Sequence, residues 1–192
     1  MAKVNREIVI VEALDLLDEV GLDAITTRQL AKRLGVEQPT LYWHFKTKAQ
    51  LLSAMADAAV APHAAAPPPA PGADWRDWLR EHTRSFRRTL LMRRDGARLH
   101  AGSRPGVGDM ERIRRIVAFF VAAGLPEHDA MMGMFAANRF AVGSVLEEQA
   151  DAARDLEQDE AIGLPSIDYS AAFEAGLSLI LKGMEVAKAG TS

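Results

Sequence analysis

The chain of 192 residues contains no cysteine, which excludes disulfide bonds and thiolate metal sites and agrees with a reducing compartment. It also lacks any apolar run of 18 or more residues, and Lys3, Arg6, Glu7 and Glu12 interrupt its first 20 residues. Neither a transmembrane helix nor a signal peptide fits this pattern, so we expect a cytoplasmic protein. The motifs H-E-x-x-H and G-x-S-x-G and a phosphate-binding loop are missing too, which argues against an enzyme.

Charge is distributed unevenly along the chain, and the net charge of -3 argues against general coating of nucleic acid. Residues 26–48 hold five basic residues and a single acid, Glu37. Such a cluster is typical of a surface that binds phosphates. A solvated helix face can have the same composition, so charge alone leaves both interpretations open. The basic residues are Arg28, Lys32, Arg33, Lys46 and Lys48.

The first two helices are predicted from their caps and from apolar residues that recur with the helical period. Asn5 caps a helix over residues 6–20, which a glycine ends. Thr26 and Gln29 form a capping box that opens a helix of barely two turns, and Gly35 stops it. Two short helices joined at this glycine would form a helix-turn-helix unit.

A third and a fourth helix follow closely. The third covers about residues 39–44 and begins at a proline, whose missing N–H group is no loss at the first position of a helix. Thr47 and Gln50 form a second capping box, which opens a helix over about residues 48–61. We expect Pro62 to end this helix, because proline disrupts helical hydrogen bonding.

The third helix carries three consecutive rings, Tyr42, Trp43 and His44. If Leu41 turns toward the core, the rings and Thr40 spread over the remaining surface of the helix. Rings and hydroxyl groups on a basic platform suit a DNA groove, where Tyr and His bind phosphates and Gln or Arg reads base edges. The competing interpretation is that Tyr42 and Trp43 pack against neighbouring helices. For the segment as a whole, the pattern favours DNA binding.

The remainder of the chain begins with residues 62–72, whose five prolines predict a semi-rigid linker. A long helix capped by Asp74 follows, and Asp95 with the next glycine breaks it. No segment alternates with the period of a strand, so the chain is predicted to be all-α. Three further helices are expected over residues 109–123, 128–149 and 169–187.

Two features of this C-terminal part bear on assembly. Residues 147–165 are acidic and are predicted to be irregular. The last helix is small and apolar on more than one face, so it needs cover on two sides. A partner chain could supply that cover.

Three stretches of the sequence resemble the tetracycline repressor (TetR) family: ITTRQLAKRLGVEQPTLYWHFKTKAQLL (25–52), SFRRTLLMRRDGARLHAGSRP (85–105) and FAVGSVLEEQ (140–149). The resemblance implies a homodimeric repressor that binds one palindromic operator half-site per recognition helix. It further implies release from DNA when a small molecule enters the C-terminal core. The implied domains are a DNA-binding domain (1–48), a connecting fourth helix, and a ligand-binding and dimerisation domain (62–192).

The resemblance assigns roles to the helix-turn-helix residues. Side chains at the positions of Arg28 and Gln38 contact bases in the family, which agrees with the preference of arginine for guanine and of glutamine for adenine. Pro39 and Thr40 would meet thymine methyl groups and their neighbours. The residues implied to hold the DNA backbone are Thr27, Tyr42, Trp43, His44 and Lys48.

The resemblance also implies an effector site in which the ligand binds together with Mg²⁺. The metal would be held by His100 and, through water, by Ser103 and by Glu147 of the partner subunit. Four polar positions of the family's pocket differ here. The replacements are histidine by Ala64, asparagine by His82, glutamine by Ile116 and a second histidine by Arg139. A pocket without those hydrogen-bond partners would discriminate against its former ligand. The expected effector is therefore tetracycline-like or another polycyclic compound. The pocket residues implied are His82, Phe86, His100, Ser103, Arg104, Pro105, Ile116 and Arg139.

Two other functions remain open from the sequence. A ligand-independent DNA-binding dimer would keep the helix-turn-helix but have a vestigial pocket. A Mg²⁺-dependent hydrolase would be built on His100 and Glu147, but no nucleophile paired with a base accompanies these residues.

Overall fold

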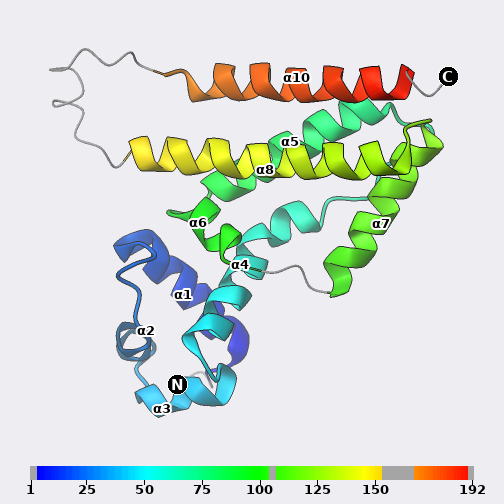
Figure 1. Cartoon of the computed structure of the whole chain (residues 1–192). Coiled ribbons are helices and arrows are strands. Elements are labelled where there is room, and N and C mark those ends of the chain that lie inside the picture. Colours follow the sequence, from blue (N-terminus) through cyan, green and yellow to red (C-terminus); the bar gives the residue numbers. More distant parts are fainter. Residues whose placement is uncertain (1–3, 104–106, 153–166, 190–192) are drawn as a thin grey trace, which may run out of the picture. The chain divides into compact units, whose positions relative to one another are not determined.

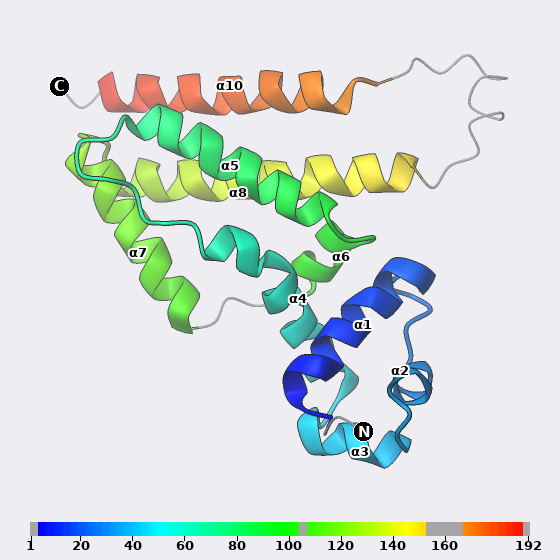
Figure 2. The same ribbon diagram turned by 180° about the vertical axis from the view of Figure 1, so that it is seen from behind.

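The computed structural model describes residues 4–103, 107–152 and 167–189, and all regular secondary structure in these ranges is helical. The predicted all-α class is confirmed. Contacts divide the chain into two compact units: unit 1 comprises 1–65 and 89–104, and unit 2 comprises 66–88 and 105–192 (Figures 1 and 2). The helices are α1 (Arg6–Val20), α2 (Thr27–Leu34), α3 (Gln38–His44), α4 (Lys48–Ala64), α5 (Trp75–Leu91), α6 (Gly96–Ala101), α7 (Val107–Ala122), α8 (Glu127–Asp151) and α10 (Tyr169–Ala189).

Unit 1 is built around one apolar core. Helices α1, α2, α3 and α4 each contribute to it, and Leu99 of α6 packs into the same cluster. Val9, Leu17, Leu30 and Met55 are completely shielded from solvent there. Because α6 shares this core and contacts α4, a displacement of α6 would be transmitted to the packing of α4.

The predicted caps of the first helices are confirmed. The Ile8 N–H donates to Asn5 Oδ1 over 2.8 Å, and the Gln29 N–H donates to the hydroxyl of Thr26 over 3.2 Å. Gly35 ends α2 in the left-handed region, with a φ of 64°, which an L side chain rarely adopts. The turn between α2 and α3 is therefore determined by local chemistry.

The turn between α5 and α6 docks onto the end of α1. Asp95 adopts a positive φ of 55°, and its Oδ2 accepts a hydrogen bond of 2.8 Å from the Leu22 N–H. Arg93 pairs with Asp18 at 2.5 Å, which adds a charged contact to the same junction. This arrangement places α6 within unit 1.

Unit 2 has its core between α5, α7, α8 and α10. Helices α8 and α10 lie side by side along their length in both views (Figures 1 and 2). Phe140 of α8 stacks on Phe173 of α10 with ring centroids 5.4 Å apart. Gly176 leaves room for the Phe140 ring, which a Cβ atom at that position would contact. Small residues thus allow the two helices to approach closely.

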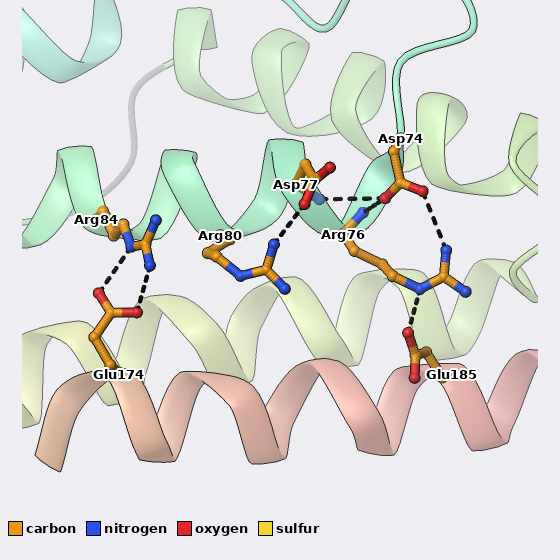
Figure 3. A network of polar contacts seen from close by, with 7 residues as sticks. All are labelled: Asp74, Arg76, Asp77, Arg80, Arg84, Glu174 and Glu185. Carbon is orange, nitrogen blue, oxygen red and sulfur yellow. Dashed lines mark hydrogen bonds and ion pairs between the residues drawn. The ribbon is translucent and has the colours of Figure 1, made fainter. Parts of the chain in front are cut away.

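Ion pairs connect α5 with α10 along the surface of unit 2 (Figure 3). Arg84 donates two hydrogen bonds, of 2.7 and 2.6 Å, to the carboxylate of Glu174, and this pairing lowers the pKa of Glu174. Arg76 bonds Glu185 farther along α10. These side chains are exposed to solvent, so the pairs contribute little to stability and mainly set the register of the two helices.

Two predictions about helix boundaries were wrong, and one helix was not predicted. Pro62 does not end the fourth helix, because α4 continues to Ala64 and a proline in the last turn removes only one helical hydrogen bond. The acidic stretch from Glu147 is helical as far as Asp151, where packing against α10 extends α8. Helix α6 was not predicted, because its six residues show too little of a helical period.

The positions of the predicted domain boundaries are not decided by these compact units and stay a prediction. Among the described residues, no helix is both long and apolar enough to cross a membrane.

Candidate nucleic-acid interface and ligand site

Helix α3 directs its rings toward solvent. Leu41 is only 3% exposed, whereas Tyr42 is 43% and Trp43 is 81% exposed. Phe45 adopts an extended backbone after the last turn and returns the chain to the core. The competing interpretation, in which Trp43 packs against neighbouring helices, is therefore wrong. The surface of α3 offers rings that no intramolecular packing requires.

Gln38 connects the beginnings of α2 and α3. Its Nε2 donates a hydrogen bond of 2.9 Å to the Thr27 hydroxyl and lies 3.5 Å from the Tyr42 hydroxyl. Arg28, next to Thr27, is exposed. The structure thus brings Thr27, Gln38 and Tyr42 together beside an exposed guanidinium, which is a suitable arrangement for reading base edges.

The lysines near α3 differ in their contacts. Lys48 Nζ donates a hydrogen bond of 2.8 Å to the Ile25 carbonyl, so the side chain joins the start of α4 to the chain before α2. Lys46 Nζ lies 6.0 Å from the centroid of the Trp43 ring. Both residues remain exposed and can carry positive charge to a phosphate.

Arg33 belongs to the basic cluster in the sequence, but its charge is used inside unit 1. Its guanidinium pairs with Glu12 at 2.7 Å and with Glu19 at 2.5 Å, both on α1. These two partners raise the pKa of Arg33 above its ordinary value. Arg33 therefore fastens α2 to α1 and contributes less net charge to the α3 surface than its position in the sequence indicates.

The residues predicted to bind the effector lie in both units. In unit 1, His100 is half-buried near the end of α6. The Ser103 hydroxyl donates a hydrogen bond of 2.7 Å to the backbone carbonyl of His100. In unit 2, Phe86 and Ile116 are buried, so their side chains belong to the interior of that unit. Arg104 and Pro105 lie outside the described residues.

The remaining predicted residues of unit 2 differ in environment. Arg139 is exposed on α8, with its guanidinium carbon 5.2 Å from the centre of the Phe135 ring. Glu147 is exposed on the same helix. His82 is half-buried on α5 and stacks on Trp78.

The ring of His82 is neutral under ordinary conditions. Burial is the main cause that lowers its pKa to about 4, and the nearby positive charge of Arg112 lowers it further. A neutral imidazole can donate one hydrogen bond and accept another. Neither Trp78 nor Arg112 was among the residues predicted from the sequence. The spacing of four residues between Trp78 and His82 places these two side chains on one face of a helix.

Mg²⁺ prefers oxygen ligands in an octahedral arrangement. His100 and Ser103 offer an imidazole and a hydroxyl within three residues, and water would have to complete the octahedral shell that Mg²⁺ requires. Within the described residues, no group of three or more His, Cys, Asp or Glu side chains forms a metal site. These two donors would therefore leave most of the coordination shell of the ion to water.

Comparisons with known proteins agree with this architecture. Residues 9–55 match the family described as bacterial regulatory proteins, tetR family, and residues 68–164 match the tetracyclin repressor-like C-terminal domain. The tetracycline repressor protein class C of Escherichia coli is 44% identical over 96% of this chain and 92% of its own. A TetR-family transcriptional regulator of Streptomyces coelicolor is 62% identical, with a TM-score of 0.75 over 95% of each chain.

A solved structure is informative about ligands. TetR class A in complex with 5a,6-anhydrotetracycline and magnesium is 44% identical to the chain, with a TM-score of 0.78 over 92% of this chain and 95% of its own. The similarity extends through both compact units.

Proposed function

The chain belongs to the TetR family of ligand-responsive transcriptional repressors, and from this premise we propose that it binds a palindromic operator as a homodimer in the cytoplasm and leaves it when a small-molecule effector binds. The observation that carries the proposal is the exposed surface of α3, with Tyr42 and Trp43 outward and Gln38 oriented by Thr27. In this arrangement Arg28 and Gln38 read bases, while Tyr42, Trp43, His44 and Lys48 bind the phosphate backbone.

Dimerisation is supported by the outward faces of α8 and α10. Leu179 is 69% and Val186 is 73% exposed on α10, and Met132 and Leu146 are exposed on α8. Ala136 and Gly183 lie on the same faces and would allow close approach of another helix. A second copy placed by a two-fold axis would cover both faces and would form a four-helix arrangement. Two recognition helices would then be separated by about 34 Å, one turn of DNA.

The effector acts through α6 in this proposal. His100 lies on α6, while Leu99 of the same helix packs in the core that holds Met55 of α4. A ligand that moves α6 would therefore shift α4 and change the separation of the recognition helices in the dimer. One conformation of the dimer fits the operator well and another fits it poorly. The effector needs to bind the second conformation more tightly than the first. Mg²⁺ would be held by His100 and would neutralise acidic oxygens of the ligand, with Ser103 and Glu147 of the partner subunit binding through water.

The first test concerns base reading. The operator would be selected from a pool of random duplexes, and its affinity for the Arg28→Ala variant would then be measured. Loss of a bidentate contact to guanine should weaken binding by about 1–3 kcal/mol and relax the preference at one base position.

Lys48→Ala is the matched comparison, because it removes a charge that faces phosphates in the proposal. It should weaken binding to all sequences alike and reduce the salt dependence by about one phosphate contact. If Arg28→Ala binds the selected operator as tightly as the wild type does, direct reading by Arg28 is wrong. If the wild-type protein selects no sequence at all, the proposed repressor function fails.

The second test concerns the dimer. Leu179→Asp places a charge in the middle of the outward face of α10, where burial against a second copy would require its desolvation. Light scattering after size-exclusion chromatography should give about twice the chain mass of 20.9 kDa for the wild type and the single-chain mass for the variant. Val11→Asp makes the same change at an exposed position of α1 and should leave the dimer intact. A dimeric Leu179→Asp variant would show that this face is not the interface.

A further inference from the structure

A row of arginines runs along one side of α5. Arg76, Arg80, Arg84 and Arg87 follow one another at spacings of four, four and three residues, which places them on one side of the helix. Such a row is usually a solvated face. In this structure, three of the four arginines reach acids on other helices, whereas Arg80 bonds the carboxylate of Asp77 on α5 itself. We call these four residues the arginine row.

Two members of the arginine row hold α10 near its opposite ends. Figure 3 shows Arg84 and Arg76 reaching from α5 to Glu174 and Glu185 of α10. The two acids lie about three helical turns apart, so they share one edge of α10. Rotation of α10 about its axis would therefore break both contacts together. Sliding of α10 by one turn would move each carboxylate by about 5.4 Å, with the same result.

A third member, Arg87, joins three helices. Its Nη2 donates a hydrogen bond of 2.6 Å to Glu148 of α8, and its guanidinium carbon lies 5.0 Å from the centroid of the Phe173 ring of α10. The side chain of Arg87 is 12% exposed, so water screens this pair less than it screens the pairs of Arg84 and Arg76. Both α8 and α10 are thus fixed to α5 by the arginine row.

Apolar burial alone specifies the orientation of α10 weakly. Leu179 and Val186 are exposed on one side of this helix, whereas Phe173 and Leu177 are buried on the other. Because the hydrophobic effect is not directional, a rotated α10 would also bury apolar side chains. A polar contact that only one orientation satisfies can discriminate between such alternatives.

We propose that the arginine row positions α8 and α10 for dimerisation, by fixing which face of α10 stays outward to meet a second copy of the chain. This inference rests on the proposed function, because it concerns the homodimer that binds the operator. Without the ion pairs, each protomer would spend less time in the orientation that dimerises, and the loss counts twice in a dimer. Exposed ion pairs add little to folding stability, so we expect the effect in the dissociation constant of the dimer.

The test measures the dimer dissociation constant of the full-length chain by sedimentation velocity over a dilution series. Arg84→Glu and Glu174→Arg each place like charges opposite one another, and each should weaken the dimer by about tenfold. The double variant restores an oppositely charged pair and should recover most of the wild-type affinity. One single variant makes the chain more negative and the other makes it less negative, so a loss shared by both cannot come from net charge.

Arg88→Glu is the matched control. Arg88 is the neighbour of Arg87 on α5, but it pairs with Glu81 of the same helix at 2.6 Å. Reversing its charge therefore leaves the contacts between α5 and α10 in place, and this variant should dimerise like the wild type. Circular dichroism and urea unfolding confirm that each variant remains folded.

The outcomes separate this inference from the proposed function. An unchanged dissociation constant in both single variants, a double variant that dimerises no more tightly than the single ones, or an equal loss in Arg88→Glu would overturn the inference. If any of these results accompanies a wild-type dimer that selects an operator, the proposed function stands. A wild-type chain that is monomeric at every concentration tested would overturn the proposed homodimer as well.

Discussion

Between pH 7.5 and pH 5, the wild-type protein should lose about 2 kcal/mol more folding stability than the His82→Asn variant loses. Burial on α5, and secondarily the charge of Arg112, lowers the pKa of His82 from its ordinary value of 6.5 to about 4. In the unfolded chain the ring takes up a proton as the pH falls through 6.5, while in the folded chain it stays neutral until about pH 4. The unfolded state therefore binds more protons in this window, so folding stability is complete above pH 6.5 and declines toward pH 4.

Urea unfolding at pH 7.5 and at pH 5 measures this effect as the difference between the two midpoints. Carboxylates also contribute to the change of the midpoint with pH. The change in the wild type is therefore compared with the change in the His82→Asn variant. His128→Asn changes a histidine that is exposed at the start of α8, and it should leave the difference between the two midpoints as it is in the wild type. The same difference between midpoints in the wild type and in His82→Asn would mean that His82 is not buried as a neutral ring.

Replacing Gly96 with alanine should destabilise the protein by about 2–3 kcal/mol or more, because the new methyl group has no room. A Cβ atom at Gly96 would overlap the carbonyl oxygen of Leu90, and a backbone atom cannot move aside as a side chain can. The turn around Asp95 would have to open, and this turn holds the hydrogen bond from the Leu22 N–H to Asp95. The effect should therefore appear in unit 1, where α6 packs.

Thermal and urea unfolding of the variant give the loss of stability. The matched control is Gly102→Ala, because Gly102 has a φ of -81° and a Cβ atom there would make only ordinary contacts, the nearest at 3.7 Å. Both changes remove one glycine from the same short segment, so the unfolded chain is affected alike. Equal stability of the two variants would show that the tight approach of Gly96 to Leu90 does not exist in solution.

The DNA-binding surface was largely predictable because its signals are local. The caps at Asn5 and Thr26, the glycine that ends α2 and the proline at the start of α3 each act within a few residues. A helix of seven residues that buries Leu41 has to leave neighbouring rings outside, and the exposure of Trp43 follows from that geometry. The DNA contacts assigned to these residues stay predictions.

The environment of the predicted effector residues was harder to predict for a physical reason. Arg112 and His82 lie on separate helices, and the property that distinguishes them is desolvation, which depends on everything that packs around them. Sequence resemblance pointed to the position of His82 but could not indicate that Trp78 stacks on its ring or that burial lowers its pKa. Helix α6 escaped prediction because six residues carry no periodic signal, although its Leu99 completes the core of unit 1.

The sequence by itself determined where most helices begin and end and which family the chain resembles, since caps, turns and apolar periodicity depend on neighbours only a few residues away. Tertiary structure alone decided how charges are used. Arg33 pairs with acids 21 and 14 residues away and so contributes less charge to the basic surface, and burial lowers the pKa of Arg112. Electrostatic energies depend on distance and burial in space, and neither quantity can be read from the order of residues.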